Sequence, residues 1–346
     1  MMNDKDFYSD VQINDILVPT VFHVEYNFFL DLIRMEKSNP KRILVVGLLC
    51  VDIIAECDSY PIEDTDQRCR EMRKQKGGNG ANTSYVLAEF GISVDLLTNI
   101  GSGNDMEFVK MSMSSVNLSK SLHVNEPMPT SLVIINAQNG SRTILHSGQS
   151  LPELKLDDFT RINLSEYRWI HFEGRSSNAE NICEMIAFIR HFNHNTEDPI
   201  IISIEIEKCR EEIICFFDKA DVVFVSKDHV KFHGYHTPED GIQNLITKCK
   251  PGATLICAWG DKGAWAKPPS GEIVKSSAYP PKKVIDTLGA GDTFNATMIY
   301  SLMQNIPLQQ SLDIACRISG AKVGQKGYHG LREQIEDYFI KSGCVM

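Results

Sequence analysis

Buried strands and helices alternate along most of this chain, and that alternation constrains its fold more than any other feature. Short apolar runs typical of fully buried strands occur at residues 43–46, 94–97, 169–172, 200–204, 222–225 and 255–257. Helical patterns lie between or after them, at residues 79–90, 181–192 and 211–217 and in an amphipathic segment at 294–303. Strands and helices in turn predict a mostly parallel sheet flanked by helices, so the predicted class is α/β. Ligands of such sheets gather at the carboxyl ends of the strands.

Two stretches interrupt this rhythm. Residues 51–74 and 131–145 alternate apolar with polar side chains instead of presenting continuous apolar runs. That period of two predicts short antiparallel strands outside the main sheet.

Charge and cysteine content exclude several classes of protein. The 346 residues carry a formal net charge of −10, which argues against nucleic acid as a partner because phosphate backbones require a basic face. The ten cysteines form no C-x-x-C pair and have no regular spacing. We interpret them as reduced thiols of a cytoplasmic protein rather than a disulfide framework or a zinc site.

The N-terminal region has no sequence pattern typical of a signal peptide or a membrane-spanning segment. It lacks the charged-then-apolar order of a signal peptide, and residues 21–33 fall short of the roughly 20 apolar residues that a membrane span requires. Aromatic and aliphatic residues at helical spacing between 22 and 33 predict a short surface helix instead. We therefore expect no membrane partner.

A glycine-rich turn at residues 286–294 indicates an anion site. Gly289, Ala290 and Gly291 open a predicted helix, where unpaired N–H groups and the helix dipole suit a phosphate. Asp292 stands in the same place, and a carboxylate beside a phosphate suits a base that deprotonates an attacking hydroxyl. Taken alone, Gly-Ala-Gly-Asp is also an ordinary turn with an N-capping aspartate.

A second glycine-rich turn at residues 77–82 precedes another predicted helix. Asn79 and Asn82 lie three residues apart and share a helix face, and Gly78 lets a ligand approach the backbone. Amide side chains both donate and accept hydrogen bonds, as a polyhydroxylated sugar requires. A helix cap with a solvent-facing asparagine is the structural alternative.

Two common nucleotide motifs are missing from the sequence. There is no G-x-x-x-x-G-K-[ST] segment, which excludes a P-loop. Gly78 and Gly80 start a dinucleotide-like pattern, but Thr83 stands where its third glycine belongs. A nicotinamide oxidoreductase is therefore disfavoured.

The two glycine motifs together resemble the ribokinase family of carbohydrate kinases, over residues of about 42 to 330. The intervening segments at 169–175, 205–208, 222–228 and 257–259 are similar to the branch of that family that phosphorylates fructose at O1. The resemblance implies a ribokinase-like fold with a small β-strand lid and ATP-dependent transfer to fructose, with Asp292 as general base. A kinase for another sugar or a nucleoside such as ribose or adenosine, and a non-catalytic sensor on the same fold, remain open.

The resemblance also assigns further residues. It implies sugar contacts from Asp52, Gly78, Asn79, Asn82 and Asp292, and from an Asp64 that a partner subunit contributes. It implies nucleotide contacts from the segments Gly260, Asp261, Lys262, Gly263 and Gly289, Ala290, Gly291, Asp292, together with Arg142 of the lid. A homodimer clasped through the lid strands is implied as well.

Metal contacts are less defined. Much of the family has Asn-x-x-Glu where this chain has residues 226–229, Ser-Lys-Asp-His. Mg²⁺ is still expected because phosphoryl transfer from ATP needs its charge neutralised, with Asp228, Glu205 and Glu207 as candidates. The resemblance also implies a potassium ion beside Asp286.

Three parts follow along the chain. We expect an N-terminal extension at 1–40, a kinase domain at 41–332 with lid strands near 51–76 and 123–146, and a C-terminal tail at 333–346.

Overall fold

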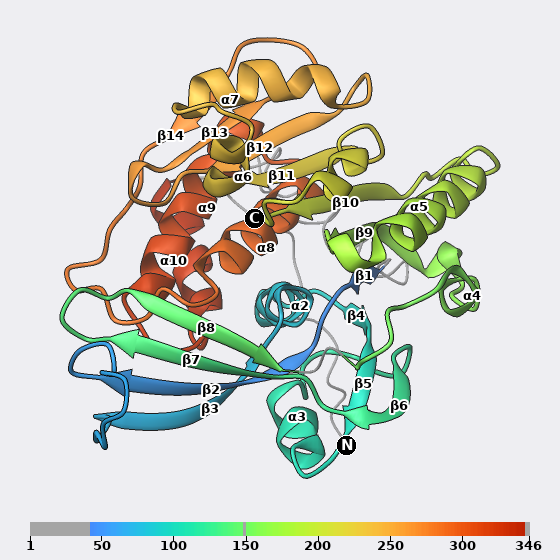
Figure 1. The fold of residues 1–346 in the computed structure, drawn as a ribbon. Helices are drawn as coiled ribbons and strands as arrows, with labels where there is room; N and C mark the ends of the chain where they lie inside the picture. The colour runs from blue at the N-terminus through green and yellow to red at the C-terminus, as the bar shows by residue number, and fades with distance from the viewer. Residues whose placement is uncertain (1–41, 148–149, 343–346) are drawn as a thin grey trace, which may run out of the picture. The chain divides into compact units, whose positions relative to one another are not determined.

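The computed structural model describes residues 42–147 and 150–342 (Figure 1). The helix that the sequence predicts near 22–33 lies outside these residues. The strands are β1 (Arg42–Val46), β2 (Cys50–Cys57), β3 (Glu71–Gly77), β4 (Val94–Leu97), β5 (Asn99–Ser102), β6 (Leu122–Pro127), β7 (Thr130–Asn136), β8 (Arg142–Ser147), β9 (Tyr167–Glu173), β10 (Ile201–Ile206), β11 (Val222–Ser226), β12 (Thr254–Ala258), β13 (Ala264–Lys267) and β14 (Val274–Ser276). The α-helices are α2 (Asn79–Glu89), α3 (Met106–Ser112), α4 (Leu156–Phe159), α5 (Ala179–Asn193), α6 (Lys227–Phe232), α7 (Pro238–Leu245), α8 (Ala290–Met303), α9 (Leu308–Val323) and α10 (Leu331–Ser342).

The main sheet has the strand order β14-β13-β12-β11-β10-β9-β1-β4. Its strands from β12 to β4 pair in parallel, and β13 and β14 add antiparallel strands at one edge. The predicted α/β class with a mostly parallel sheet is confirmed. The antiparallel edge was not predicted, because its strands are short.

Both faces of this sheet are buried, as strand β1 illustrates. Ile43 and Val45 belong to a core that includes residues of α2, α8 and α9, whereas Leu44 and Val46 belong to the core against α5. Figure 1 shows the red helices α8 and α9 and the yellow-green helix α5 on opposite faces of the sheet. Burial on both faces explains why these strands read as continuous apolar runs.

A second sheet of four strands, in the order β3-β2-β7-β8, forms the lid. Strand β2 pairs antiparallel with β3 and in parallel with β7, and β7 pairs antiparallel with β8. On one face Ile54 and Val133 are buried against Leu288, the residue before Gly289 of the turn at 286–294. On the outer face Met72, Leu132 and Leu145 are exposed. The lid therefore has apolar side chains on both faces.

Three sequence predictions need correction. Strand β6 pairs in parallel with β5, so the second lid segment begins at Thr130 rather than near 123. Residues 211–216 form a 3₁₀ helix instead of an α-helix. Helix α8 is not amphipathic: it is buried on nearly all sides because it packs against both α2 and α9.

In the described part of the chain, no helix has the length and apolar character needed to cross a lipid bilayer.

Candidate active site

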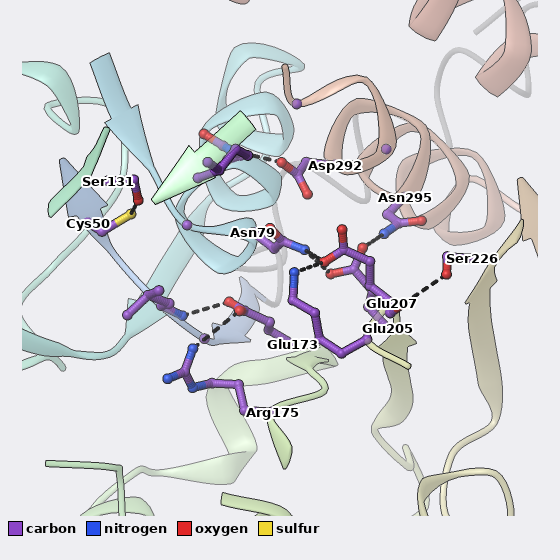
Figure 2. Close-up of a pocket in the computed structure, with 18 of the residues that line it drawn as sticks. Cys50, Asn79, Ser131, Glu173, Arg175, Glu205, Glu207, Ser226, Asp292 and Asn295 are labelled. Carbon is purple, nitrogen blue, oxygen red and sulfur yellow. Dashed lines mark hydrogen bonds and ion pairs between the residues drawn. The ribbon is translucent and has the colours of Figure 1, made fainter. Parts of the chain in front are cut away.

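A cavity of about 820 Å³ lies at the carboxyl ends of the parallel strands. Its wall includes the strand ends Val46, Glu173 and Ala258, and Ile144 of the lid. Figure 2 shows Asp292 and Asn295 projecting from one helix toward Asn79 and the glutamates of the main sheet. This is the position where open α/β sheets bind ligands.

The turn before α8 presents main-chain amides to the cavity. Gly289 is left-handed at φ 75°, and the Ala290 amide donates to the Thr287 carbonyl at 3.3 Å. The amides without a partner inside the helix are therefore those of the next two residues, Gly291 and Asp292. Together with the helix dipole they form a site suited to an oxyanion or a phosphate. The sequence had assigned the Ala290 amide to this site as well, but that amide is already engaged.

Gly289 is required for two reasons. Its positive φ disfavours any side chain. A Cβ at this position would also lie 1.9 Å from the hydroxyl oxygen of Tyr328, a buried residue. Tyr328 thus fixes one wall of the turn.

Asp292 is only 6% exposed, and its carboxylate accepts a hydrogen bond of 2.8 Å from the Asn82 side-chain amide. Burial raises the pKa of Asp292 to about 7. The hydrogen bond from Asn82 opposes this rise, and the negative charges of Glu207 and Glu173 add to it. The positive charge of Lys76 lowers the pKa again. A carboxyl with a pKa near neutrality is suited to accept a proton from an alcohol and release it later.

The Gly-Gly pair of the other motif allows two close contacts. A Cβ at Gly77 would lie 2.3 Å from a carboxylate oxygen of Asp52, which packs directly against the glycine backbone. A Cβ at Gly78, where φ is 92°, would lie 2.2 Å from the Leu48 carbonyl oxygen. Asp52 is buried, and this burial raises its pKa, against opposing hydrogen bonds that include one from the nearby Cys50 thiol. The cavity wall includes Asp52 and Gly78.

Asn79 lines the same cavity but already has carboxylate partners. Its side-chain nitrogen donates to Glu205 and to Glu207, at 2.9 Å in each case, and Asn295 donates to Glu205 at 2.8 Å. The two asparagines of the motif, Asn79 and Asn82, therefore contact different acids. The sequence had placed both against one ligand.

Glu173, which the sequence analysis did not single out as a site residue, links the first strand to the glycine motif. Its carboxylate accepts from the backbone amides of Leu48 at 2.8 Å and Gly80 at 3.0 Å, and Arg175 lies 3.5 Å from its other oxygen. Glu173 ends the buried strand β9. The sequence signal that could have identified Glu173 as a site residue is its position as an acid at the carboxyl end of a buried parallel strand.

The lid contributes Arg142, whose guanidinium donates to the Thr287 hydroxyl at 2.8 Å from across the cavity mouth. Arg142 is exposed and lines the cavity, as does Gly260 after β12. These two predicted nucleotide residues are therefore brought to the same cavity as the anion turn.

Four assigned residues are not brought to the cavity wall. Asp64 lies in the connection between β2 and β3, exposed, with a φ of 59°. Asp261 and Lys262 are exposed in the connection between β12 and β13, and Gly263, at φ 102°, packs against the Ser276 carbonyl. The turn 260–263 connects the antiparallel strands β12 and β13.

The acids near the cavity differ in their suitability for Mg²⁺. Burial, with the charges of Asp292 and Glu207, raises the pKa of Glu205 well above its usual range, so Glu205 favours the neutral form. Burial also acts to raise the pKa of Glu207, but Lys208 at 2.6 Å and the Asn79 amide lower it overall. Asp228 lines the cavity and is exposed. No cluster of three or more potential metal ligands occurs within the described residues.

Asp286 does not fit a potassium ion. Its carboxylate lies 3.1 Å from the Lys322 ammonium and 3.4 Å from the Arg73 guanidinium, and its carbonyl accepts from Lys322 at 3.0 Å. Both Asp286 and Lys322 are buried. Both cations contact one carboxylate oxygen, and the backbone amide of Leu288 donates to the other at 2.9 Å, so the oxygens that a potassium ion would need already have partners.

A model of the pfkB family carbohydrate kinases matches residues 40–333. Among curated proteins, ketohexokinase from Mus musculus is 40% identical over 298 residues, which cover 84% of this chain and 99% of the mouse protein. A 5-dehydro-2-deoxygluconokinase from Listeria monocytogenes is 21% identical over 304 residues, covering 81% of this chain and 89% of that protein.

Solved structures show the same fold at low sequence identity. Ribokinase from Arabidopsis thaliana complexed with ribose and ATP has a TM-score of 0.69 at 18% identity, covering 86% of this chain and 98% of that one. Adenosine kinase from Sinorhizobium meliloti has a TM-score of 0.73 at 18% identity, covering 86% and 99%. The fold is therefore ribokinase-like.

Proposed function

The chain belongs to the pfkB family of carbohydrate kinases, and on that premise we propose that it transfers the γ-phosphoryl group of ATP to O1 of fructose. The observation that carries this proposal is the position of Asp292, a buried acid with a pKa of about 7 at the first turn of a helix whose free amides face the cavity. The substrate follows from the mouse ketohexokinase, the relative with 40% identity.

Each step of the transfer has a group of this chain beside it. The Asp292 carboxylate removes the proton from the O1 hydroxyl as that oxygen attacks the γ-phosphorus, and the bond from the γ-phosphorus to the bridging oxygen breaks, so that ADP leaves. The amides of Gly291 and Asp292 donate to the oxygens of the transferring group, where negative charge accumulates. Asn82 holds the carboxylate in place through its 2.8 Å hydrogen bond.

In this proposal the sugar and the nucleotide bind on opposite sides of the transferring phosphoryl group. Asp52, on the lid strand beside the glycine motif, accepts hydrogen bonds from sugar hydroxyls. Arg142 exchanges its hydrogen bond with Thr287 for the ATP phosphates, and Gly260 lies under the adenosine. We assign smaller roles to 261–263, since the wall of the cavity does not include them.

We assign magnesium to Glu207, the ionised acid at the rim of the cavity. Mg²⁺ neutralises the phosphate charge of bound ATP and is usually held by one or two carboxylates together with phosphates and waters. Glu207 meets that requirement, because Lys208 keeps it ionised and its side chain is 43% exposed. Glu205 is buried and favours its neutral form. We leave potassium out of the proposal, because Lys322 already supplies positive charge at Asp286.

Asp64 contributes to the sugar site of a second copy. It projects from the lid without lining its own cavity, and the outer lid face exposes Met72, Leu132 and Leu145. Strands with apolar side chains on both faces favour pairing with another sheet face. We therefore propose a homodimer clasped through the lids.

The reaction takes place in the cytoplasm under this proposal. All nine described cysteines are free, including Cys183, whose thiol donates a hydrogen bond of 3.5 Å to the Cys215 sulfur without forming a disulfide. Two thiols this close without a disulfide favour a reducing compartment.

The test is ADP release in the presence of fructose, tagatose, glucose, ribose and adenosine, with the phosphorylated position read by NMR. We expect fructose to give the highest kcat/KM and the phosphate to appear on O1. A higher kcat/KM for ribose or adenosine would overturn the substrate and leave phosphoryl transfer standing. No release with any of the five would favour the sensor.

A further inference from the structure

A buried lysine, Lys76, lies next to the catalytic turn without lining the cavity. It is the last residue but one of β3 and is only 5% exposed. Its ammonium nitrogen lies 4.0 Å from the ring centroids of both Tyr85 and Tyr328. Tyr85 belongs to α2, and Tyr328 lies between α9 and α10. Two aromatic rings at this distance form a cation–π cage for the ammonium group.

Lys76 also contacts the asparagine that holds the catalytic acid. Its nitrogen lies 3.4 Å from the side-chain oxygen of Asn82, whose side-chain nitrogen donates to Asp292 at 2.8 Å. An ammonium group only donates hydrogen bonds, so its partner must be the amide oxygen. The amide nitrogen is then turned to Asp292.

We propose that Lys76 is a positioning residue for phosphoryl transfer: from its tyrosine cage it fixes the Asn82 amide and supplies positive charge that favours the ionised form of Asp292. This proposal rests on the proposed role of Asp292 as general base. Lys76 itself touches neither sugar nor nucleotide. It acts through Asn82 and through its charge.

The charges around the two groups set the direction of the effect. Burial lowers the pKa of Lys76 to about 7. The negative charge of Asp292 opposes this fall, the positive charge of Lys322 adds to it, and the negative charges of Asp52 and Glu89 oppose it as well. Asn82, Glu207, Glu173 and Lys76 act on Asp292, and the charge of Asp292 in turn acts on Glu205, Lys322 and Tyr328. Of the two lysines, Lys76 contacts Asn82, whereas Lys322 pairs with Asp286. Removing Lys76 therefore raises the pKa of Asp292, and a higher pH is needed to ionise the base.

The cage joins Lys76 to the anion turn as well. The hydroxyl of Tyr328 occupies the space that a Cβ of Gly289 would need. One face of the buried Tyr328 ring thus bounds the ammonium group, and its edge bounds the catalytic turn. A ring held on both sides excludes water from the surroundings of the ammonium group, and this strengthens its electrostatic interactions with nearby charges.

The experiment compares Lys76→Met with Lys74→Met, a matched control two residues earlier on β3. Lys74 is 49% exposed and pairs with Asp105 at the surface. We measure kcat/KM for fructose from acid to alkaline pH. For Lys76→Met we expect the acid limb of the pH profile, where kcat/KM rises with pH, to move to a pH about one unit higher. At a pH on that limb, kcat/KM should then be about ten-fold lower than in the wild type. Lys74→Met should leave the limb in place.

Two more variants keep the proposal open to refutation if Lys76→Met folds poorly. Lys76→Arg retains the charge and the donor, so its limb should stay at the wild-type position even if its plateau is lower. Tyr85→Leu removes one wall of the cage, admits water and should move the limb in the same direction as Lys76→Met by a smaller amount. Equal plateau losses in Lys76→Met and Lys76→Arg, with neither limb displaced, would mean that Lys76 is only structural.

Failure of this inference is distinguishable from failure of the proposed function. If Asp292→Asn retains wild-type turnover, Asp292 is not the base and the premise is lost. If Asp292→Asn is inactive while the limb of Lys76→Met stays at the wild-type pH, the base stands and the role of Lys76 is refuted.

Discussion

The side-chain amide of Asn82 donates a 2.8 Å hydrogen bond to the carboxylate of Asp292, across 210 residues of sequence. The bond joins the two glycine-rich turns, one before α2 and one before α8. It brings the proposed base and helix α2 to one point of the cavity. Both turns therefore contribute to one site.

Replacing Asp292 by asparagine should abolish most of the activity. Asparagine keeps the shape but cannot accept the proton, so we expect kcat to fall by about 10²–10⁴, the usual contribution of a positioned base. Affinity for ATP should stay near the wild-type value. The measurement is a coupled ADP-release assay, with Asp157→Asn as the control because Asp157 is exposed and does not line the cavity.

The same variant should change how stability depends on pH. Burial raises the pKa of Asp292 from 3.8 to about 7, so the folded chain retains a proton that the unfolded chain has already released. This contribution to stability is present at low pH and is lost as the pH rises through about 7. Asp292→Asn cannot ionise. Urea unfolding should therefore show the variant gaining stability relative to wild type between about pH 5 and about pH 8. A constant difference would contradict the raised pKa.

The two glycines of the anion turn should respond differently to alanine. At Gly289 the left-handed backbone and the Tyr328 hydroxyl both oppose a side chain, and we expect a loss of about 2–4 kcal/mol in the free energy of unfolding. At Gly291 a Cβ meets nothing within 4 Å, so stability should be unchanged or slightly higher. Chemical denaturation of both variants provides the comparison. An equal loss at the two positions would refute the steric argument.

The two glutamates near Asn79 should differ in their effect on magnesium. Glu207→Gln removes an ionised carboxylate at the cavity rim, so the Mg²⁺ concentration for half-maximal activity should rise several-fold. Glu205→Gln replaces a buried acid that favours its neutral form, and it should leave that concentration unchanged. Activity at saturating ATP is measured against total Mg²⁺ for both variants. The opposite ranking would assign the metal to Glu205.

The sequence predicted the main sheet well because burial on both faces leaves a local record, the apolar runs such as residues 43–46 and 222–225. It did not predict that α8 is buried on nearly all sides, since that depends on the packing of α2 and α9 around it. The glycine turns were recognisable because their conformation requires glycine locally, as at Gly78 and Gly289.

The hydrogen-bond partners inside the site could not be predicted from the sequence. Asn79 and Asn82 look equivalent on a helix face, yet one binds Glu205 and Glu207 and the other binds Asp292. Which acid each asparagine meets depends on segments more than a hundred residues away. Lys76 gave no signal either, because a lysine near the end of a polar strand is ordinarily a surface residue.

The outer face of the lid provides the last prediction. Leu145 of β8 is 54% exposed on that face, next to the exposed Leu132 with which it pairs in the sheet. If two lids clasp there, Leu145→Lys should bury an unpaired charge in the interface and shift the protein from dimer to a monomer of 38.9 kDa in light scattering. KM for fructose should rise at the same time, because the monomer loses the partner's Asp64. Phe232→Lys, at an exposed position on α6, should leave the mass unchanged. A wild-type protein that is monomeric at assay concentration and fully active would remove Asp64 from the sugar site, since no second copy would be there to supply it.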